Sequence, residues 1–195
     1  RARLVRAHQR VLALASHDRR TGLPNRRLFE DRLSQAALAA YRDHRAGALL
    51  LVDLDGFKAV NDSQGHGSGD QVLVRVAQRL SGLARANDTA ARLGGDEFAL
   101  VLNAVDSPDA AMEMDHKVLA ALVAPIGLDN GQHVLIGASI GVALFQGPAV
   151  EALPALMDRA DRALYVSKRG GKGLVTLADV PGAAQLPQEL PPAST

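Results

Sequence analysis

The feature that most limits how this chain folds is a segment with two glycines followed by two carboxylates, residues 92–98 (RLGGDEF). Apolar residues precede and follow it, so it predicts a β-hairpin with acid in its turn. Gly94 and Gly95 allow a positive φ and let the backbone approach a ligand closely. Asp96 and Glu97 supply hard oxygen ligands. The segment therefore fits either an ordinary acidic turn or a cradle for a polyphosphate held through Mg²⁺.

The bulk composition indicates one domain with short appendages. The chain has 195 residues, of which 47% are apolar and 22% are charged, enough for a real core. Its net charge is +1, so we expect no nucleic-acid partner. No apolar run approaches the ~20 residues of a membrane span, so we expect no membrane contact by this segment.

The absence of cysteine excludes disulfides and thiolate metal sites, and it fits a reducing compartment. We therefore expect a cytoplasmic location, either alone or within a membrane-anchored or multidomain parent. The first residue is Arg rather than Met, which indicates a piece of a longer protein.

Hydrophobic periodicity predicts helices and strands that alternate along the chain. Helices are expected at 1–17, 28–40, 57–62, 72–80, 107–123 and 151–169. Strands are expected at 47–52, 89–93, 98–102, 133–136, 138–145 and 174–177, and a glycine-rich loop at 65–70. Because the two types are intermixed and some strands are adjacent, the pattern predicts an α+β fold with a mixed central sheet surrounded by helices.

Three parts are expected along the chain. Residues 1–17 form an N-terminal linker helix, which is either the end of a coiled coil from an upstream domain or a helix packed on its own domain. Residues 18–178 form the folded domain. Residues 179–195, rich in Pro and Ala, are expected to be a disordered tail.

A carboxylate stands where the apolar strand 47–52 ends, at Asp53. Burying its charge is costly, and a divalent cation is the best compensation. Asp55 lies two residues on and shares its face. Asp53 with Asp96 or Glu97 would form a carboxylate site of the kind that Mg²⁺ favours. For Asp55, the alternative of capping the following short helix is more convincing than it is for Asp53.

Cations and a donor–acceptor pair accompany these carboxylates. Lys58 is placed to reach a phosphate, and Lys168 and Lys172 flank two glycines after the last helix. The alternative for the last two is a helix C-terminus that favours cations. Asn61 and Asp70 could read a purine edge, since a carboxylate accepts from guanine N1–H and its amine. Each could instead be a loop or N-cap residue.

Several motifs in order give the chain a close resemblance to a known family. They are DRRTGLPNRR, VDLDGFKAVNDSQGHGSGD, RLGGDEF, SIGVAL and RADRALYVSK. From about residue 18 to 176 the chain resembles the GGDEF domain of diguanylate cyclases. The resemblance implies a palm-like fold shared with nucleotidyl cyclases and polymerases. It also implies condensation of two GTP into cyclic di-GMP, with loss of two pyrophosphates.

The resemblance also assigns roles to residues. It implies Mg²⁺, or alternatively Mn²⁺, held by Asp53, the carbonyl of Leu54 and Asp96, with Glu97 also at the metal site. Catalysis would rest on these carboxylates and Lys58. Substrate would be bound by Lys58, Lys168 and Lys172 at the phosphates, by Gly94 and Gly95 at the turn, and by Asn61 and Asp70 at the guanine. Because variants that accept adenine depart at the position of Asp70, its retention favours GTP.

A second matched element is Arg85-Ala-Asn-Asp88, an RxxD motif at a set distance before Gly94. In the family this spacing marks a site where cyclic di-GMP inhibits its own synthesis. The alternative is a solvated helix end.

The resemblance implies a homodimer as well. One hairpin binds one GTP, so two protomers must face each other for catalysis. An upstream sensory domain could control how they meet through the N-terminal helix.

Two positions depart from the family pattern. Arg20 stands where Leu is usual before Thr21, so the local packing is expected to differ. Lys172 stands where Arg is usual, which keeps the charge but loses the bidentate fork, so the grip on phosphate is expected to be weaker. The rival function is a GGDEF module that binds GTP or cyclic di-GMP as a regulator without turnover.

Overall fold

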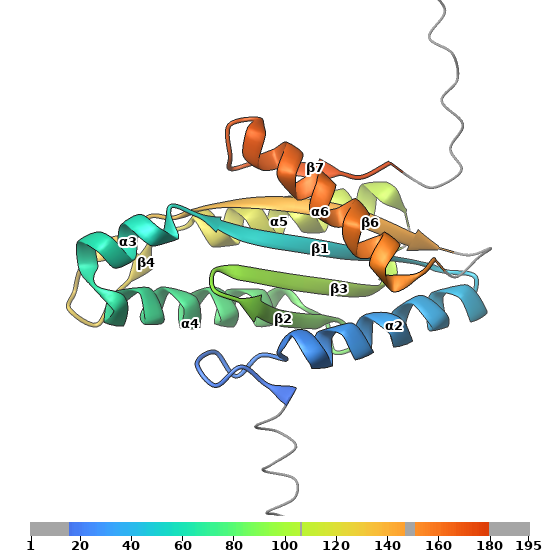
Figure 1. Ribbon diagram of the computed structural model, residues 1–195, viewed down its shortest axis with the longest axis horizontal. Coiled ribbons are helices and arrows are strands. Elements are labelled where there is room, and N and C mark those ends of the chain that lie inside the picture. The colour runs from blue at the N-terminus through green and yellow to red at the C-terminus, as the bar shows by residue number, and fades with distance from the viewer. Residues whose placement is uncertain (1–15, 106, 147–150, 180–195) are drawn as a thin grey trace, which may run out of the picture.

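The computed structural model describes residues 16–105, 107–146 and 151–179 (Figure 1). Its helices are α2 (Arg26–Arg42), α3 (Phe57–Gln64), α4 (His66–Leu83), α5 (Pro108–Val123) and α6 (Leu153–Arg169). Its strands are β1 (Ala46–Asp55), β2 (Thr89–Gly94), β3 (Glu97–Val105), β4 (Ile126–Gly127), β5 (His133–Val134), β6 (Gly137–Gln146) and β7 (Val175–Leu177). The predicted N-terminal helix and tail lie almost wholly outside the described residues.

The central sheet has five strands in the order β2-β3-β1-β6-β7. Strand β1 lies in the middle and pairs antiparallel with β3 and β6, while β6 pairs parallel with β7. Strands β4 and β5 form a separate two-stranded sheet. The predicted α+β fold with a mixed sheet is confirmed.

Helices cover both faces of this sheet, which explains why β1 reads as a continuous apolar run. Leu49 and Leu51 pack in one buried cluster with α2 and α6. Leu50 and Val52 point to the other face and pack with α4 and α5. Figure 1 shows α2 and α6 in front of the sheet and α4 and α5 behind it. The two carboxylates of β1, Asp53 and Asp55, stand at the end of this buried run, where the strand leaves the layers of helices.

A single glycine lets α6 lie directly on the sheet. A Cβ at Gly141 of β6 would come within 2.2 Å of the backbone nitrogen of Leu164 and 2.3 Å of the carbonyl oxygen of Ala160. Any side chain there would push α6 outward, because backbone atoms cannot give way. Gly141 thus sets the height of α6, and with it the position of the helix's last turn.

The glycine-rich segment 65–70 is helical rather than a loop, so that prediction is wrong. Gly65 has a φ of 82° and ends α3 and begins α4 at the same residue. Tertiary packing overrides the poor helix propensity of glycine here, since Ser68 and Gly69 are buried. Asp70 consequently lies inside α4, and the alternative that it caps this helix is excluded.

None of the helices in the described part of the chain is both long enough and apolar enough to cross a bilayer.

Candidate active site

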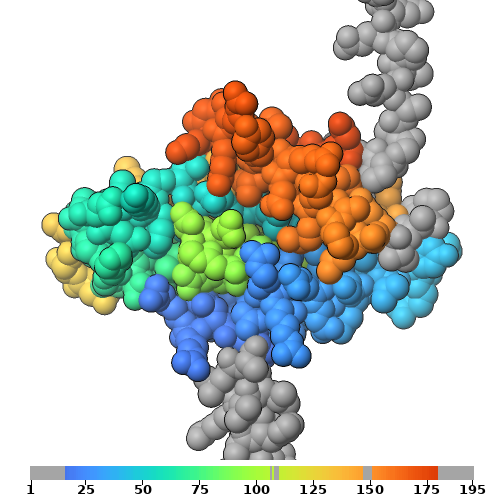
Figure 2. All heavy atoms as spheres, viewed as in Figure 1, coloured from blue at the N-terminus to red at the C-terminus, as the bar shows by residue number. Residues whose placement is uncertain are grey.

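The predicted acidic hairpin is present, and its turn consists of Gly95 and Asp96. Gly94 pairs with Glu97 across the two strands, and the register shifts between Arg92 and Gly94. Gly94 has a φ of 150° and Gly95 one of 50°, values that favour glycine. In Figure 2 the hairpin lies at the centre of one face, bordered by α3, by α6 and by the segment that leads into α2.

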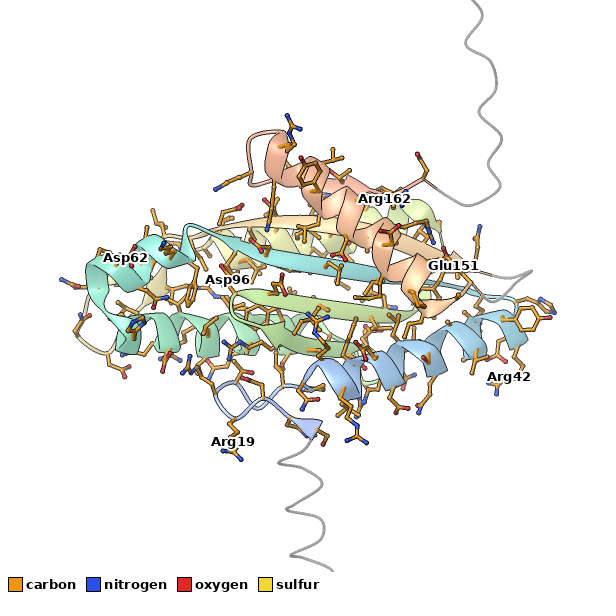
Figure 3. The ribbon with its side chains drawn as sticks, viewed as in Figure 1. Arg19, Arg42, Asp62, Asp96, Glu151 and Arg162 are labelled. Carbon is orange, nitrogen blue, oxygen red and sulfur yellow. The ribbon has the colours of Figure 1, made fainter. Side chains whose placement is uncertain are left out.

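The end of β1 lies beside this turn. Asp53 pairs directly with Glu97 across β1 and β3, so their side chains leave the sheet on the same face. The Leu54 amide donates a hydrogen bond to the Asp96 carbonyl oxygen over 3.2 Å. Figure 3 labels Asp96 at this end of the hairpin. Tertiary structure thus brings the two predicted carboxylate elements together.

The surroundings of Asp53 disfavour the ionised form of its carboxyl group. Burial raises the pKa of Asp53, and the neighbouring carboxylates of Asp96 and Asp55 raise it further. One cation opposes this rise only in part, because Lys168 Nζ lies 2.7 Å from Asp53 Oδ2 and the pKa of Asp53 stays raised. A half-buried carboxylate among like charges favours a bound cation.

Lys168 lies in the last turn of α6, where the helix dipole also favours a positive charge. Sequence reasoning placed it among the phosphate ligands and did not foresee its contact with Asp53. The contact depends on the height of α6 over β6, which no local pattern in the sequence reveals.

Asp55 does not cap α3, so that alternative is wrong. The N-cap of α3 is Gly56, which makes no side-chain capping bond. Asp55 Oδ2 instead accepts hydrogen bonds from Ser139 Oγ over 2.8 Å and from the Gly173 amide over 3.1 Å. Asp55 therefore fastens the segment after α6, which contains Lys172, to the end of the sheet.

Glu97 is half exposed, and its carboxylate lies 3.6 Å from an Arg26 nitrogen of α2. The contact turns Glu97 toward α2, while Asp96 adjoins Asp53. The metal role assigned to Glu97 stays a prediction.

The two residues predicted to read a purine, Asn61 and Asp70, lie where α3 meets α4. A Cβ at Gly69 would lie 1.9 Å from Asn61 Oδ1 and 3.3 Å from the Phe57 ring, so only glycine lets Asn61 sit against α4. Asp70, the next residue of α4, forms an ion pair with Arg20 over 2.6 Å. The two predicted residues thus lie together, with a cation from a distant turn beside them.

That turn, residues 18–23, is tied to the hairpin by a network that sequence reasoning missed. The buried Arg92 donates through Nη1 to both carboxylate oxygens of Asp18, over 3.0 and 3.1 Å. Its Nε and Nη2 donate to the Gly95 carbonyl oxygen over 3.1 and 2.7 Å. Burial alone would raise the pKa of Asp18, but hydrogen bonds from Thr21 and Arg92 outweigh it and lower the pKa.

Comparisons with known proteins show the family of the chain. The profile of the family described as "Diguanylate cyclase, GGDEF domain" matches residues 15–173. The chain belongs to this family. It is 46% identical over 169 residues, 87% of its length, to the Pseudomonas aeruginosa protein named bifunctional diguanylate cyclase/cyclic di-GMP phosphodiesterase MucR, of which it spans 24%.

Solved GGDEF domains are similar in structure too. The GGDEF domain of TpbB from Pseudomonas aeruginosa has a TM-score of 0.79 and 42% identity, covering 84% of this chain and 94% of that one. The coiled coil and GGDEF domain of DgcB from Caulobacter crescentus, in complex with c-di-GMP, has a TM-score of 0.82 and 32% identity, covering 91% and 93%. The chain spans 41% of the curated diguanylate cyclase TpbB.

The RxxD motif of this GGDEF domain lies in the turn between α4 and β2. Asp88 Oδ2 accepts from the Arg85 amide over 2.9 Å, and Asp88 Oδ1 accepts from the Asn103 amide over 3.1 Å. Arg85 is exposed. The contacts of Asp88 order the turn and hold Arg85 at the surface, where a ligand could reach it.

The oxygen ligands of this GGDEF domain fit Mg²⁺. The described residues contain no group of three or more His, Cys, Asp or Glu side chains arranged to hold a metal ion. Mg²⁺ does not need one, since it usually takes one or two carboxylates and completes its shell with water and substrate phosphates. Asp53 and Asp96 supply two carboxylates at the hairpin turn, and burial together with the neighbouring carboxylates raises the pKa of Asp53, a setting in which a bound cation would relieve the cost of its charge.

Proposed function

We propose that this GGDEF domain is a diguanylate cyclase that condenses two GTP into cyclic di-GMP and two pyrophosphates. The observation that carries the proposal is the closeness of Asp53 to Asp96 at the hairpin turn. The amide of Leu54, the residue after Asp53, donates to the Asp96 carbonyl oxygen, and the Asp96 carboxylate helps burial to raise the pKa of Asp53. The names of MucR and TpbB support it at the level of the family.

In this reaction each 3′-hydroxyl attacks the α-phosphorus of the partner GTP, and pyrophosphate leaves. Asp53, the Leu54 carbonyl and Asp96 would hold Mg²⁺ or Mn²⁺, with Glu97 at the same site. When bound, the ion neutralises developing charge and lowers the pKa of the attacking hydroxyl.

The cations of the chain would hold the triphosphate. Lys168 reaches Asp53 from α6, so its ammonium lies where a triphosphate would meet the carboxylates. Lys58 at the start of α3 and Lys172 in the segment held by Asp55 are both exposed and would bind phosphate oxygens as point charges. Gly94 and Gly95, without side chains, would let phosphate approach the turn.

Guanine would be read by Asn61 and Asp70. A carboxylate accepts from the N1–H and the exocyclic amine of guanine. Adenine does not present this pair of adjacent donors, because its N1 is an acceptor. One hairpin holds one GTP, so the second nucleotide must come from another copy of the chain. We propose a homodimer in which the two hairpins face each other, controlled by an upstream sensory domain.

The decisive experiment incubates concentrated protein with GTP and Mg²⁺ and separates the nucleotides. Cyclic di-GMP should appear with the parent and not with Asp96→Asn, whose circular dichroism should match the parent. GTP that is bound but unchanged would instead indicate the regulatory module. Undiminished product from Asp96→Asn would remove Asp96 from the metal site.

We also propose that Arg85 and Asp88 bind cyclic di-GMP and inhibit synthesis. The exposed guanidinium would fork onto guanine or phosphate, while the lone pairs left on Asp88 accept from a guanine edge. Arg85→Ala should therefore raise the product concentration needed for half inhibition at least tenfold, with the initial rate unchanged. Equal inhibition of variant and parent would exclude the site.

A further inference from the structure

The 18–23 turn connects the two ends of the proposed nucleotide site. Arg92 ties its Asp18 to the hairpin turn at Gly95, and Arg20 ties it to Asp70 on α4. We infer that Arg20 is a positioning residue that holds the Asp70 carboxylate in the orientation that reads guanine. The inference rests on the proposed role of Asp70 as the guanine acceptor.

The contact leaves the carboxylate able to bind a base. The shortest distance of the ion pair joins Arg20 Nη1 to Asp70 Oδ1 over 2.6 Å. An ionised carboxylate offers about four lone-pair sites. One guanidinium nitrogen can therefore share Oδ1 with a guanine donor while Oδ2 accepts the second donor.

The pair is also open to solvent, with side-chain exposures of 46% for Arg20 and 43% for Asp70. A nucleotide can thus reach it without moving the core. Exposed ion pairs contribute little to stability, so a structural role explains this contact poorly. The contact restricts the rotamer of Asp70. This matters because guanine presents two adjacent donors, and both carboxylate oxygens can accept from them only when the carboxylate lies in the plane of the base.

Arg20 is itself held in place by its own turn. The Thr21 amide donates to Asp18 Oδ1 over 2.8 Å and the Thr21 hydroxyl over 2.7 Å. The Gly22 amide donates to the Asp18 carbonyl oxygen over 2.8 Å, which closes the turn. The backbone of Arg20 is therefore pre-organised beside α4, which lowers the entropy cost of the contact. An apolar residue at this position could not hold Asp70.

The test measures binding of 3′-deoxy-GTP, which lacks the attacking hydroxyl and cannot be condensed. Arg20→Leu should weaken binding roughly two- to fivefold, the size expected of an exposed pair. Arg20→Lys should recover most of the affinity. Arg19→Leu, the matched control one residue away in the same turn and also exposed, should match the parent.

A double-mutant cycle shows whether Arg20 acts through Asp70. In an Asp70→Asn background Arg20→Leu should have no further effect. The parent's preference for 3′-deoxy-GTP over 3′-deoxy-ITP, which lacks the exocyclic amine, should narrow in Arg20→Leu. In the cyclisation assay the same variant should raise the KM for GTP and leave kcat unchanged.

Unchanged binding by Arg20→Leu would overturn the inference, and so would tighter binding or an equal loss in the Asp70→Asn background. Tighter binding would mean that Arg20 competes with guanine. Failure of the parent to bind 3′-deoxy-GTP would overturn it as well. A parent that binds 3′-deoxy-GTP but forms no cyclic di-GMP would refute the proposed function alone, because the binding measurement does not depend on turnover.

Discussion

At each end of the site an aspartate forms an ion pair with a basic side chain from an element distant in sequence, yet the surroundings of the two aspartates differ. At the hairpin, Lys168 lies 2.7 Å from Asp53, whose side chain is 14% exposed. At the α3–α4 junction, Arg20 lies 2.6 Å from Asp70, whose side chain is 43% exposed. The distances are nearly equal, so distance does not separate the two roles.

Burial separates them. Charge on Asp53 is costly, because burial and two neighbouring carboxylates all raise its pKa, and a cation relieves that cost. The Asp70 side chain is exposed to solvent, so its ion pair with Arg20 contributes little to stability and mainly orients the carboxylate. The hairpin end is thus suited to holding a metal and the α3–α4 end to recognition.

The largest effect should come from removing the buried charge at the hairpin. Asp53→Asn should lower kcat at least ~100-fold, because the carboxylate that favours a cation is gone. The folded state raises the pKa of Asp53, so its charge opposes folding at neutral pH. The free energy of unfolding at pH 7 should therefore be unchanged or higher, measured by urea denaturation. A marked fall in stability would contradict the contrast between the two ends.

The next effect concerns the connection between the two ends. Arg92→Met should lower the free energy of unfolding by about 2–4 kcal/mol, since it leaves the carboxylate of Asp18 and the Gly95 carbonyl without their buried donor. Arg42→Met, which breaks an exposed pair with Asp43, is the matched control and should keep the parent's urea midpoint.

The loss should depend on pH. The folded pKa of Asp18 lies below its unfolded value, so its contribution is complete above about pH 4 and disappears as pH falls through the folded pKa. The difference in the free energy of unfolding between parent and Arg92→Met should thus narrow in acid, while the part due to the lost donor to the Gly95 carbonyl remains. A constant difference down to pH 2 would contradict the ion pair as the cause.

The last effect extends the comparison to an aspartate whose carboxylate has no hydrogen-bond partner among the described residues. Asp115 of α5 is fully buried, and within the described residues its carboxylate oxygens accept no hydrogen bond. Burial raises its pKa to about 7, opposed only by His116. Because the folded pKa exceeds the unfolded value, stability should fall as pH rises from about 4 to 7, by up to ~1.4 kcal/mol per pH unit.

Asp115→Asn should remove this slope, which urea titrations at several pH values would show. Identical slopes in parent and variant would mean that Asp115 is solvated, and burial would then be a poor guide to the cost at Asp53 as well.

Sequence patterns predicted the elements that depend on local periodicity. Strand β1, the hairpin and the helices α2, α5 and α6 appear close to their expected bounds. The prediction failed at residues 65–70, where glycine content suggested a loop. Packing of Gly69 against Asn61 makes that segment helical, and only a neighbouring helix can supply such a contact.

The candidate site divides in the same way. The carboxylates, the lysines and the proposed purine-reading pair were predicted from local sequence as chemical groups. Their partners were not, because Ser139 reaches Asp55, and Arg92 reaches Asp18, from elements far apart in sequence. Strand register and helix height set these contacts, and neither leaves a local signal.

By itself, then, the sequence determined which strand would be buried, where the acidic turn would lie and which charged groups were available, since these follow from local pattern. Only the tertiary structure decided that Lys168 meets Asp53 and that Arg20 meets Asp70. The physical reason is that a charge acquires its role from burial and from its neighbours. Burial and neighbours are both fixed only in the folded chain, where α6 packs on Gly141 and the 18–23 turn contacts α4.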